Sequence, residues 1–261
     1  MKLLTLNTHS LAEEDAPIKA KILADAIIKE KADVIALQEV NQTINEEICT
    51  CPDITGKVKK DNFLLEVIKN INASQNYHGV WLPIKKGYGK FDEGIALLSK
   101  LEIIETKDFY VSHSEDYNNW KTRRIVGIKT NKGWFFSVHF GFWNDEDSFL
   151  SQWERLCAQL PENEKIWLMG DFNSPSHIKG EGYEHILNSN WYDSFALAKE
   201  KDDGATVDSS IDGWEKSEEK KRIDYIFSNF KADVKSSFTI FNGKREKKIS
   251  DHNGVVIETE A

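Results

Sequence analysis

The stretch LMGDFNSPSH, residues 168–177, places an acid and an amide directly after an apolar run. The run IWLM, residues 166–169, has the pattern of a strand that is buried in a core. Two explanations are open for Asp171 and Asn173, which follow it. They either cap the start of a helix, a common role of Asp, Asn and Ser, or lie where the edge of a sheet presents both side chains to a functional site.

Polar side chains also stand at the ends of several other predicted strands. They are Asn7, Glu39, His139, Asp224 and the pair Asp251–His252. Each one alone has an ordinary explanation as a cap, a turn residue or a hydrogen-bonded core residue. Together they are hard to explain in this way, because the strand ends of a compact fold converge on shared clefts. We therefore expect one site that is built from the ends of strands.

The spacing of apolar residues predicts alternating helices and strands. Helices are predicted over residues 17–31, 62–70, 145–160 and 183–189. Strands are predicted over residues 3–7, 32–37, 77–82, 94–99, 124–130, 134–139, 166–169, 222–227, 234–241 and 255–258. Residues 41–61 are polar, contain a proline and a glycine, and predict a loop. The mixture of β-α-β units and antiparallel strands indicates stacked sheets with helices outside, in a single domain over residues 1–261.

The composition indicates in which cellular compartment the protein acts and which partners it does not bind. The 261 residues include 43 acidic and 34 basic side chains, a formal net charge of −9, which disfavours a nucleic-acid partner because such proteins usually present a basic surface. Cys49, Cys51 and Cys157 match neither a disulfide framework nor a zinc motif. The first apolar run is too short for a signal peptide, and no segment is long enough to span a membrane. These features predict a cytoplasmic protein without a membrane contact or an evident obligate protein partner.

The residue types at the strand ends suit one kind of chemistry. Oxygen ligands from Glu39, Asp251 and Asn7 favour Mg²⁺ or Mn²⁺ over zinc, which prefers nitrogen and sulfur. An imidazole beside an aspartate has its tautomer fixed by the carboxylate. Asp171 can orient or deprotonate a water molecule, and Asn173 can donate to an oxyanion. A metal ion, a base, a water and charge-stabilising donors are what the hydrolysis of a phosphate ester requires.

Four ordered motifs resemble the signatures of the endonuclease/exonuclease/phosphatase superfamily. They are QEV at residues 38–40, GDFN at 170–173, RIDYI at 222–226 and SDH at 250–252. Asn7 and His139 also match. The resemblance extends over almost the whole chain, and it implies an α/β fold of the DNase I type. That fold is a four-layer α-β-β-α sandwich, in which two packed mixed sheets are flanked by helices and the site lies at one end of the sheets.

The resemblance also implies how the site works. Glu39 would bind a divalent metal ion, Mg²⁺ or Mn²⁺, with Asn7 and Asp251 nearby. Whether one ion or two act is open.

The remaining motif residues would act on the water and the phosphate. The resemblance implies that Asp171 positions or activates the water and that Asn173 helps to hold the water and the phosphate. His252, oriented by Asp224, and His139 would contact the phosphoryl oxygens. His252 as general base and His252 as electrostatic stabiliser are both open at this point.

Further stretches are similar to a bacterial subgroup that contains maltose 6'-phosphate phosphatase. They are residues 1–10, 116–124, 152–155 and 180–183. This resemblance implies a phosphomonoesterase that removes phosphate from a phosphorylated sugar. A phosphodiesterase with the same centre, either a nuclease or a sphingomyelinase-like enzyme, is the alternative. A binding protein without chemistry is disfavoured, because the set of site residues is complete.

Residues 116–124 are too polar and too aromatic for a simple linker, and we expect this loop to line the pocket. An arginine can clamp a phosphate through paired donors, and a tryptophan can stack on a sugar ring. The candidate substrate-binding residues are Arg123, Arg124, Asn118, Trp120 and Trp143. The plainer alternatives are an arginine paired with a surface carboxylate and a tryptophan that covers the core.

Further side chains lie close to the motifs. Tyr88 and the pair Asp92–Glu93 precede the predicted strand at residues 94–99 and are further candidates for the pocket. His9 and His177 flank motifs and are candidates for positions behind the residues that contact the metal ion and the phosphate.

Overall fold

Two mixed β-sheets pack face to face in the computed structural model, which describes residues 1–208 and 220–260. The larger sheet has the order β11 (Glu200–Lys201), β13 (Asp233–Ile240), β14 (Gly254–Glu260), β1 (Lys2–Asn7), β2 (Val34–Thr43), β5 (Phe91–Ser99), β4 (His78–Gly87) and β3 (Ile54–Thr55). The smaller sheet has the order β10 (Tyr192–Asp193), β12 (Asp224–Ser228), β9 (Ile166–Asp171), β8 (Gly133–His139), β7 (Arg124–Thr130) and β6 (Glu105–Tyr110).

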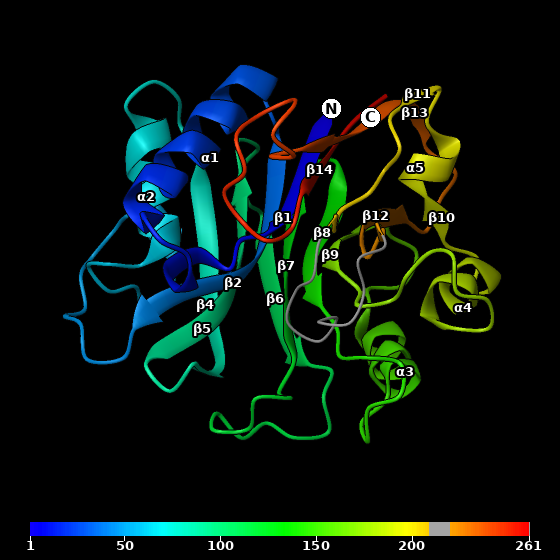
Figure 1. The fold of residues 1–261 in the computed structure, drawn as a ribbon, viewed down its shortest axis with the longest axis horizontal. Helices are drawn as coiled ribbons and strands as arrows, with labels where there is room; N and C mark the ends of the chain where they lie inside the picture. The colour runs from blue at the N-terminus through cyan, green and yellow to red at the C-terminus, as the bar shows by residue number, and fades with distance from the viewer. Residues whose placement is uncertain (209–219, 261) are drawn as a thin grey trace.

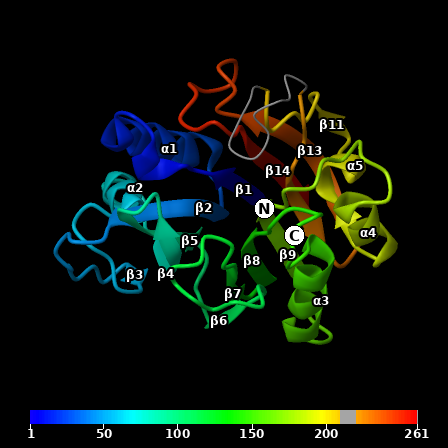
Figure 2. The same ribbon diagram turned by 60° about the horizontal axis from the view of Figure 1, so that its bottom comes forward.

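Helices cover the outer faces of both sheets, which gives the four layers of an α-β-β-α sandwich (Figure 1). The helices are α1 (Ala16–Glu30), α2 (Phe63–Asn72), α3 (Phe149–Gln159), α4 (Gly182–Asn188) and α5 (Ser194–Leu197), with a short 3₁₀ turn, η1, at Ser10–Ala12. Figure 2 shows α1 and α2 side by side on one flank and α3 on the opposite flank. The predicted fold is therefore confirmed. Within the described residues, no helix has the length and apolar character that crossing a membrane requires.

The alternation of residues along β2 explains why the sheets are covered on both faces. Val34 and Ala36 belong to the core between the two sheets, whereas Ile35 and Leu37 belong to the core beneath α1 and α2. Successive side chains of a strand point to opposite faces, so an unbroken apolar run must be buried on both sides. Each fully buried leucine or isoleucine contributes roughly 1.5–3 kcal/mol to this packing.

Local signals account for the helix limits. Proline stands in the first turn of α1, which ends at Lys31 in a left-handed conformation with φ 57°. The side chain of Asn62 caps α2 by accepting a hydrogen bond from the backbone N–H of Leu65, at 3.2 Å. Sequence patterns located both helices to within about two residues.

Several strands depart from the predictions. β2 continues to Thr43 instead of ending at residue 37, and β3 lies within the predicted loop 41–61. The strand β6 was not predicted, because it lies at the edge of its sheet and most of its side chains are exposed or half-buried. β4 runs on to Gly87, five residues beyond its predicted end. Edge strands and strand extensions lack the apolar alternation on which the predictions rest.

The sheet registers bring the motif residues to one end of the sandwich. Asn7 pairs with Gln38, the residue before Glu39, in the parallel β1–β2 ladder. His139 pairs with Asp171 in the parallel β8–β9 ladder, and Asp224 pairs with Asp171 because β12 runs antiparallel. Asp251 and His252 lie just before β14.

Candidate active site

Asp171 lies at the end of β9, and its contacts decide between the two explanations of its motif. Its Oδ1 accepts a hydrogen bond from the backbone N–H of Asn173 at 2.8 Å, the local turn that Asp favours. The next helix, α4, begins only at Gly182, so Asp171 does not cap a helix. Its Oδ2 accepts from the Asn7 side chain at 3.2 Å and faces the site. The edge of the sheet therefore places the Asp171 carboxylate in the site, beside Asn7.

Gly170 allows this arrangement. Its φ is +151°, and a Cβ at this position would lie 2.0 Å from the carbonyl oxygen of Val138 on β8. The close approach of β8 and β9 therefore requires a glycine immediately before Asp171.

Asn7 joins the two sheets. Its Nδ2 donates to Glu39 Oε1 at 2.9 Å and to Asp171 Oδ2 at 3.2 Å, so one amide holds carboxylates from β2 and β9. Glu39 has φ 51° and lies within the register shift between Leu37 and Val40, a bulge in β2. Bulges commonly re-aim a side chain beside an active site. Here the bulge lies at the residue that faces Asn7.

His252 and Asp224 form a buried pair. The Nδ1–H of His252 donates to Asp224 Oδ2 at 2.9 Å, and both residues are at most 4% exposed. Burial opposes the charge, but Asp224 and then Asp171 outweigh it and raise the pKa of His252 to about 10. Its Nε2 lies 3.9 Å from Asp171 Oδ2. The imidazole is therefore a cation at neutral pH, suited to binding an oxyanion.

His139 is held in the opposite state. Its Nε2 lies 3.4 Å from Asn173 Nδ2, which also donates to the Phe140 carbonyl at 2.9 Å. Burial, followed by the charges of Arg123 and Lys85, holds the pKa of His139 well below its ordinary value. A neutral Nε2 accepts the amide proton of Asn173. Two histidines in one cavity thus have opposite charge states, set by their neighbours.

Asp171 lies between these two imidazoles. Burial and then the charge of Asp224 raise the pKa of Asp171 to about 7. A carboxyl group with a pKa near neutrality is suited to exchange a proton with a water molecule. The geometry is thus compatible with the role that the family motif implies for it.

The carboxylates around Asn7 fit a hard divalent cation. Burial and then the charge of Glu93 raise the pKa of Glu39, and the opposing effects of the Asn7 hydrogen bond and of His9 do not cancel this rise. Asp251 accepts from Ser250 Oγ at 3.1 Å and lines the same cavity. Carboxylate and amide oxygens of this kind are ligands of Mg²⁺ and Mn²⁺. The residues present therefore fit a divalent ion held by Glu39, Asp251 and Asn7.

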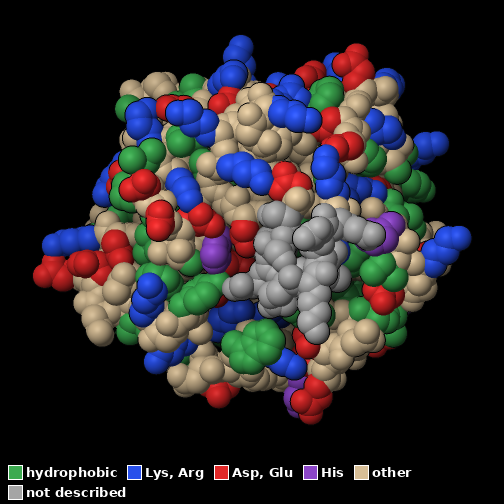
Figure 3. All heavy atoms as spheres, viewed as in Figure 1, with side chains coloured by type: hydrophobic (Ala, Val, Ile, Leu, Met, Phe, Trp, Pro, Cys, Tyr) green, Lys and Arg blue, Asp and Glu red, His purple; other side chains and the backbone are tan. Residues whose placement is uncertain are grey.

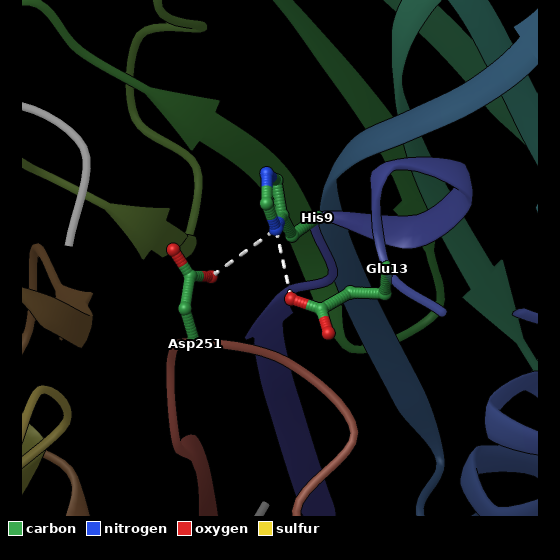
Figure 4. Close-up of side chains that lie close together, drawn as sticks. All are labelled: His9, Glu13 and Asp251. Carbon is green, nitrogen blue, oxygen red and sulfur yellow. Dashed lines mark hydrogen bonds and ion pairs between the residues drawn. The ribbon is translucent and has the colours of Figure 1, made fainter. Parts of the chain in front are cut away.

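His9 borders this group of oxygens (Figure 4). Its Nδ1 lies 2.8 Å from Glu13 Oε1 and 3.9 Å from Asp251 Oδ1, and its Nε2 lies 2.8 Å from the hydroxyl of Tyr88. Glu13 also pairs with Lys19. His9 therefore links Asp251 to η1 and to the turn that carries Tyr88.

A cavity of about 410 Å³ opens onto these side chains. Its lining includes every predicted metal and catalytic residue except Asp224, which lies behind His252. Arg123 and Trp120, from the predicted loop, line it too. Trp120 is 57% exposed and forms part of the mouth.

Three predicted substrate-binding residues lie outside the cavity. Arg124 is the first residue of β7 and points away from Arg123, so that its Nε donates to Asp108 Oδ1 at 2.8 Å. Asn118 is exposed and donates to Asp116 at 3.4 Å. Trp143 packs against the core beneath α3, with its ring 6.2 Å from that of Phe149. The plainer alternatives, a surface ion pair and a core tryptophan, apply to Arg124 and Trp143.

The sequence reasoning missed Lys85, Lys86, Gly87 and Phe142, which line the cavity, whereas Glu93, Tyr88 and His9 were among its candidates. Two other candidates, Asp92 and His177, are not part of the lining, and Asp92 pairs instead with Lys59 at 2.7 Å. Lys85 is only 7% exposed, pairs with Glu93 at 3.2 Å and donates to the Trp120 carbonyl at 2.8 Å. The alternation along β4 gave no signal for Lys85, because a register shift between Pro83 and Lys85 interrupts it, so that Lys85 pairs with Glu93 and does not share the face that carries the buried Trp81. The run KKGYG at residues 85–89 instead indicated a turn.

Comparisons with known proteins agree with this geometry. The model of the endonuclease/exonuclease/phosphatase family matches residues 4–252. Comparison with curated protein sequences finds no significant match. Among solved structures, an endonuclease/exonuclease/phosphatase family protein from Leptotrichia buccalis C-1013-b is 34% identical, with a TM-score of 0.90 and 100% of both chains covered.

Two more distant structures share the fold over 100% of both chains. A mannosyl-6-phosphatase from Bacteroides thetaiotaomicron VPI-5482 is 16% identical with a TM-score of 0.69. A 3'-5' exonuclease from Neisseria meningitidis is 16% identical with a TM-score of 0.66. The chain belongs to the endonuclease/exonuclease/phosphatase family, whose members hydrolyse phosphoester bonds and generally depend on a divalent metal ion.

Proposed function

We propose that the protein is a Mg²⁺-dependent phosphomonoesterase that removes phosphate from a small phosphorylated sugar such as maltose 6'-phosphate. The observation that carries the proposal is the cavity, which joins the catalytic side chains to buried cations and to one aromatic ring at its mouth. A volume of about 410 Å³ suits a small ligand. The mannosyl-6-phosphatase with the same fold makes a sugar phosphate a reasonable substrate class.

In this proposal Glu39, Asp251 and Asn7 would hold the ion, which would supply positive charge to neutralise the phosphoryl group. Mn²⁺ is an alternative, and one or two ions can act. Asp171 orients the attacking water and accepts its proton as the water oxygen bonds to phosphorus. The bond between phosphorus and the sugar oxygen breaks, and the sugar leaves as an alcohol after that oxygen takes up a proton from solvent. His252, as an imidazolium fixed by Asp224, stabilises charge that develops on the phosphoryl oxygens. This assigns His252 as an electrostatic stabiliser, because a group that is already protonated cannot act as a base.

Asn173 and His139 complete the phosphoryl site. The amide of Asn173 is fixed by the Phe140 carbonyl and contacts His139. Arg123 binds the phosphate, and the exposed ring of Trp120 stacks on the sugar.

The charge distribution supports a small substrate over a nucleic acid. On the face drawn in Figure 3, Lys and Arg side chains are interspersed with Asp and Glu. A net charge of −9 also disfavours a polyanionic partner. All three cysteines are free, which supports the proposal of a cytoplasmic enzyme. No obligate protein partner or membrane is part of this proposal.

Release of inorganic phosphate tests the proposal directly. The substrates are maltose 6'-phosphate, glucose 6-phosphate and a duplex with an abasic site, each with Mg²⁺ and with EDTA. We expect Mg²⁺-dependent release from a sugar phosphate. Nicking of the duplex without release from either sugar would refute the proposal and favour the phosphodiesterase alternative.

A further inference from the structure

Two buried cations form one wall of the active-site cavity. Arg123, just before β7, is 4% exposed, and Lys85 on β4 is 7% exposed. Both line the cavity beside the catalytic residues. Their charges also act on the centre, because after burial they are the main causes of the lowered pKa of His139. The wall therefore lies within electrostatic reach of the phosphoryl site.

Lys85 and Arg123 differ in whether a carboxylate balances their charge. Lys85 pairs with Glu93 at 3.2 Å. Arg123 forms no ion pair with any carboxylate of the described residues, and its Nη1 donates only to the carbonyls of Trp120 at 3.1 Å and Thr122 at 3.2 Å. The Nε of Arg123 is buried and has no acceptor within residues 1–208 and 220–260. A buried charge without a counter-charge is costly, which favours an anion in the adjoining cavity.

We propose that Arg123 and Lys85 select substrates with a terminal, doubly charged phosphate over singly charged phosphodiesters. This inference rests on the proposed function and goes further, because it assigns the preference for monoesters to two side chains. A monoester carries a charge of about −1.5 to −2 at pH 7, whereas a diester carries one negative charge and an extra substituent. Arg123 supplies the counter-charge that the second negative charge needs, and Lys85, shared with Glu93, adds to it.

A purely structural role is the competing explanation. Lys85 Nζ and Arg123 Nη1 both donate to the carbonyl of Trp120, at 2.8 and 3.1 Å, so together they fix the mouth of the cavity. Loss of this anchor would impair every substrate alike. Loss of charge selection would instead change the ratio between monoester and diester.

The test compares kcat/KM for p-nitrophenyl phosphate and bis(p-nitrophenyl) phosphate, both with Mg²⁺. In Arg123→Gln and Lys85→Met, we expect kcat/KM for the monoester to fall more than that for the diester, by a factor on the order of 10 to 100. Arg123→Lys keeps the charge and should restore most of the ratio. Arg124→Gln is the matched control, because it removes the same charge one residue away and outside the cavity.

Equal losses for both substrates in Arg123→Gln and Lys85→Met would overturn the inference, as would an Arg124→Gln variant with the same change of ratio. Circular dichroism of each variant establishes that it is folded, and if one fails to fold, the other and Arg123→Lys decide. A wild-type enzyme that prefers the diester would refute the proposed function. The variants would still test the inference in that case, because the ratio of the two kcat/KM values can change from any starting value.

Discussion

Replacing Asp224 by asparagine removes the charge that keeps His252 protonated. The two side chains are 2.9 Å apart and buried. At an effective dielectric constant of about 20, their attraction is worth roughly 5–6 kcal/mol, or about four pKa units as an upper limit. Since burial alone lowers the pKa of an imidazole, we expect the pKa of His252 to fall from about 10 to its ordinary value or below.

The lowered pKa of His252 changes the pH dependence of activity in a definite direction. In the wild type the imidazolium persists until the pH rises through about 10, whereas in Asp224→Asn it is lost several units lower. We therefore expect kcat at pH 8 to fall about 10²–10³-fold, the range for loss of a charge-stabilising donor. Activity of the variant should recover partly toward pH 5.5.

The assay is kcat for p-nitrophenyl phosphate from pH 5 to pH 10 at saturating Mg²⁺, and histidine resonances in NMR spectra of the metal-free protein report the pKa directly. The shift also affects stability. A folded-state pKa above the unfolded value of 6.5 gives stability that is fully present below pH 6.5 and lost as the pH rises through about 10. A variant with the wild-type pH profile and an unchanged pKa of His252 would refute this reasoning.

Three further perturbations test the site and its scaffold. Asp171→Asn removes the group assigned to the water, and kcat should fall by about three orders of magnitude or more while the melting temperature changes little; a fully active variant contradicts the role. Removal of metal ions with EDTA should abolish turnover, and Mg²⁺ should restore it; activity that persists after dialysis against chelator excludes the metal-dependent reaction. Gly170→Ala places a Cβ 2.0 Å from the Val138 carbonyl oxygen and should cost about 3 kcal/mol or more in urea denaturation. Gly180→Ala, where φ is +77° but a Cβ meets open space, should cost only about 1 kcal/mol, and equal losses would show that the close strand approach is unimportant.

The convergence of the candidate metal and catalytic residues on one cavity could be predicted from the sequence, because strand ends fix their positions. Asn7, His139 and Asp171 each end a strand, and the sheet registers leave little freedom in where such residues lie. Glu39 is less obvious. It lies inside β2, and only the bulge with φ 51° turns it toward Asn7. The apolar run that ends at Leu37 marked Glu39 as a residue at a strand end, although the strand itself continues to Thr43.

The candidate substrate-binding residues were harder to predict. Their positions depend on the conformation of a loop and on which face of a strand each residue occupies. Arg123 and Arg124 are adjacent and chemically identical, yet the first is buried in the cavity wall and the second pairs with Asp108 on β6. Adjacent residues in extended chain point to opposite sides, so a shift of one residue exchanges them. A run of two arginines does not indicate which one faces inward.

The difference between residues at strand ends and residues of the cavity walls explains how one catalytic centre can act on different phosphoesters. The catalytic side chains come from paired strands, which hold them through backbone ladders that no substrate contact requires. The walls come from the end of β4 and from residues 116–124, where single substitutions change charge and shape without disturbing a ladder. Lys85, Arg123 and Trp120 belong to this second group. In the function that we propose, chemistry and substrate choice are therefore separable, and the residues that decide the substrate lie outside the shared motifs.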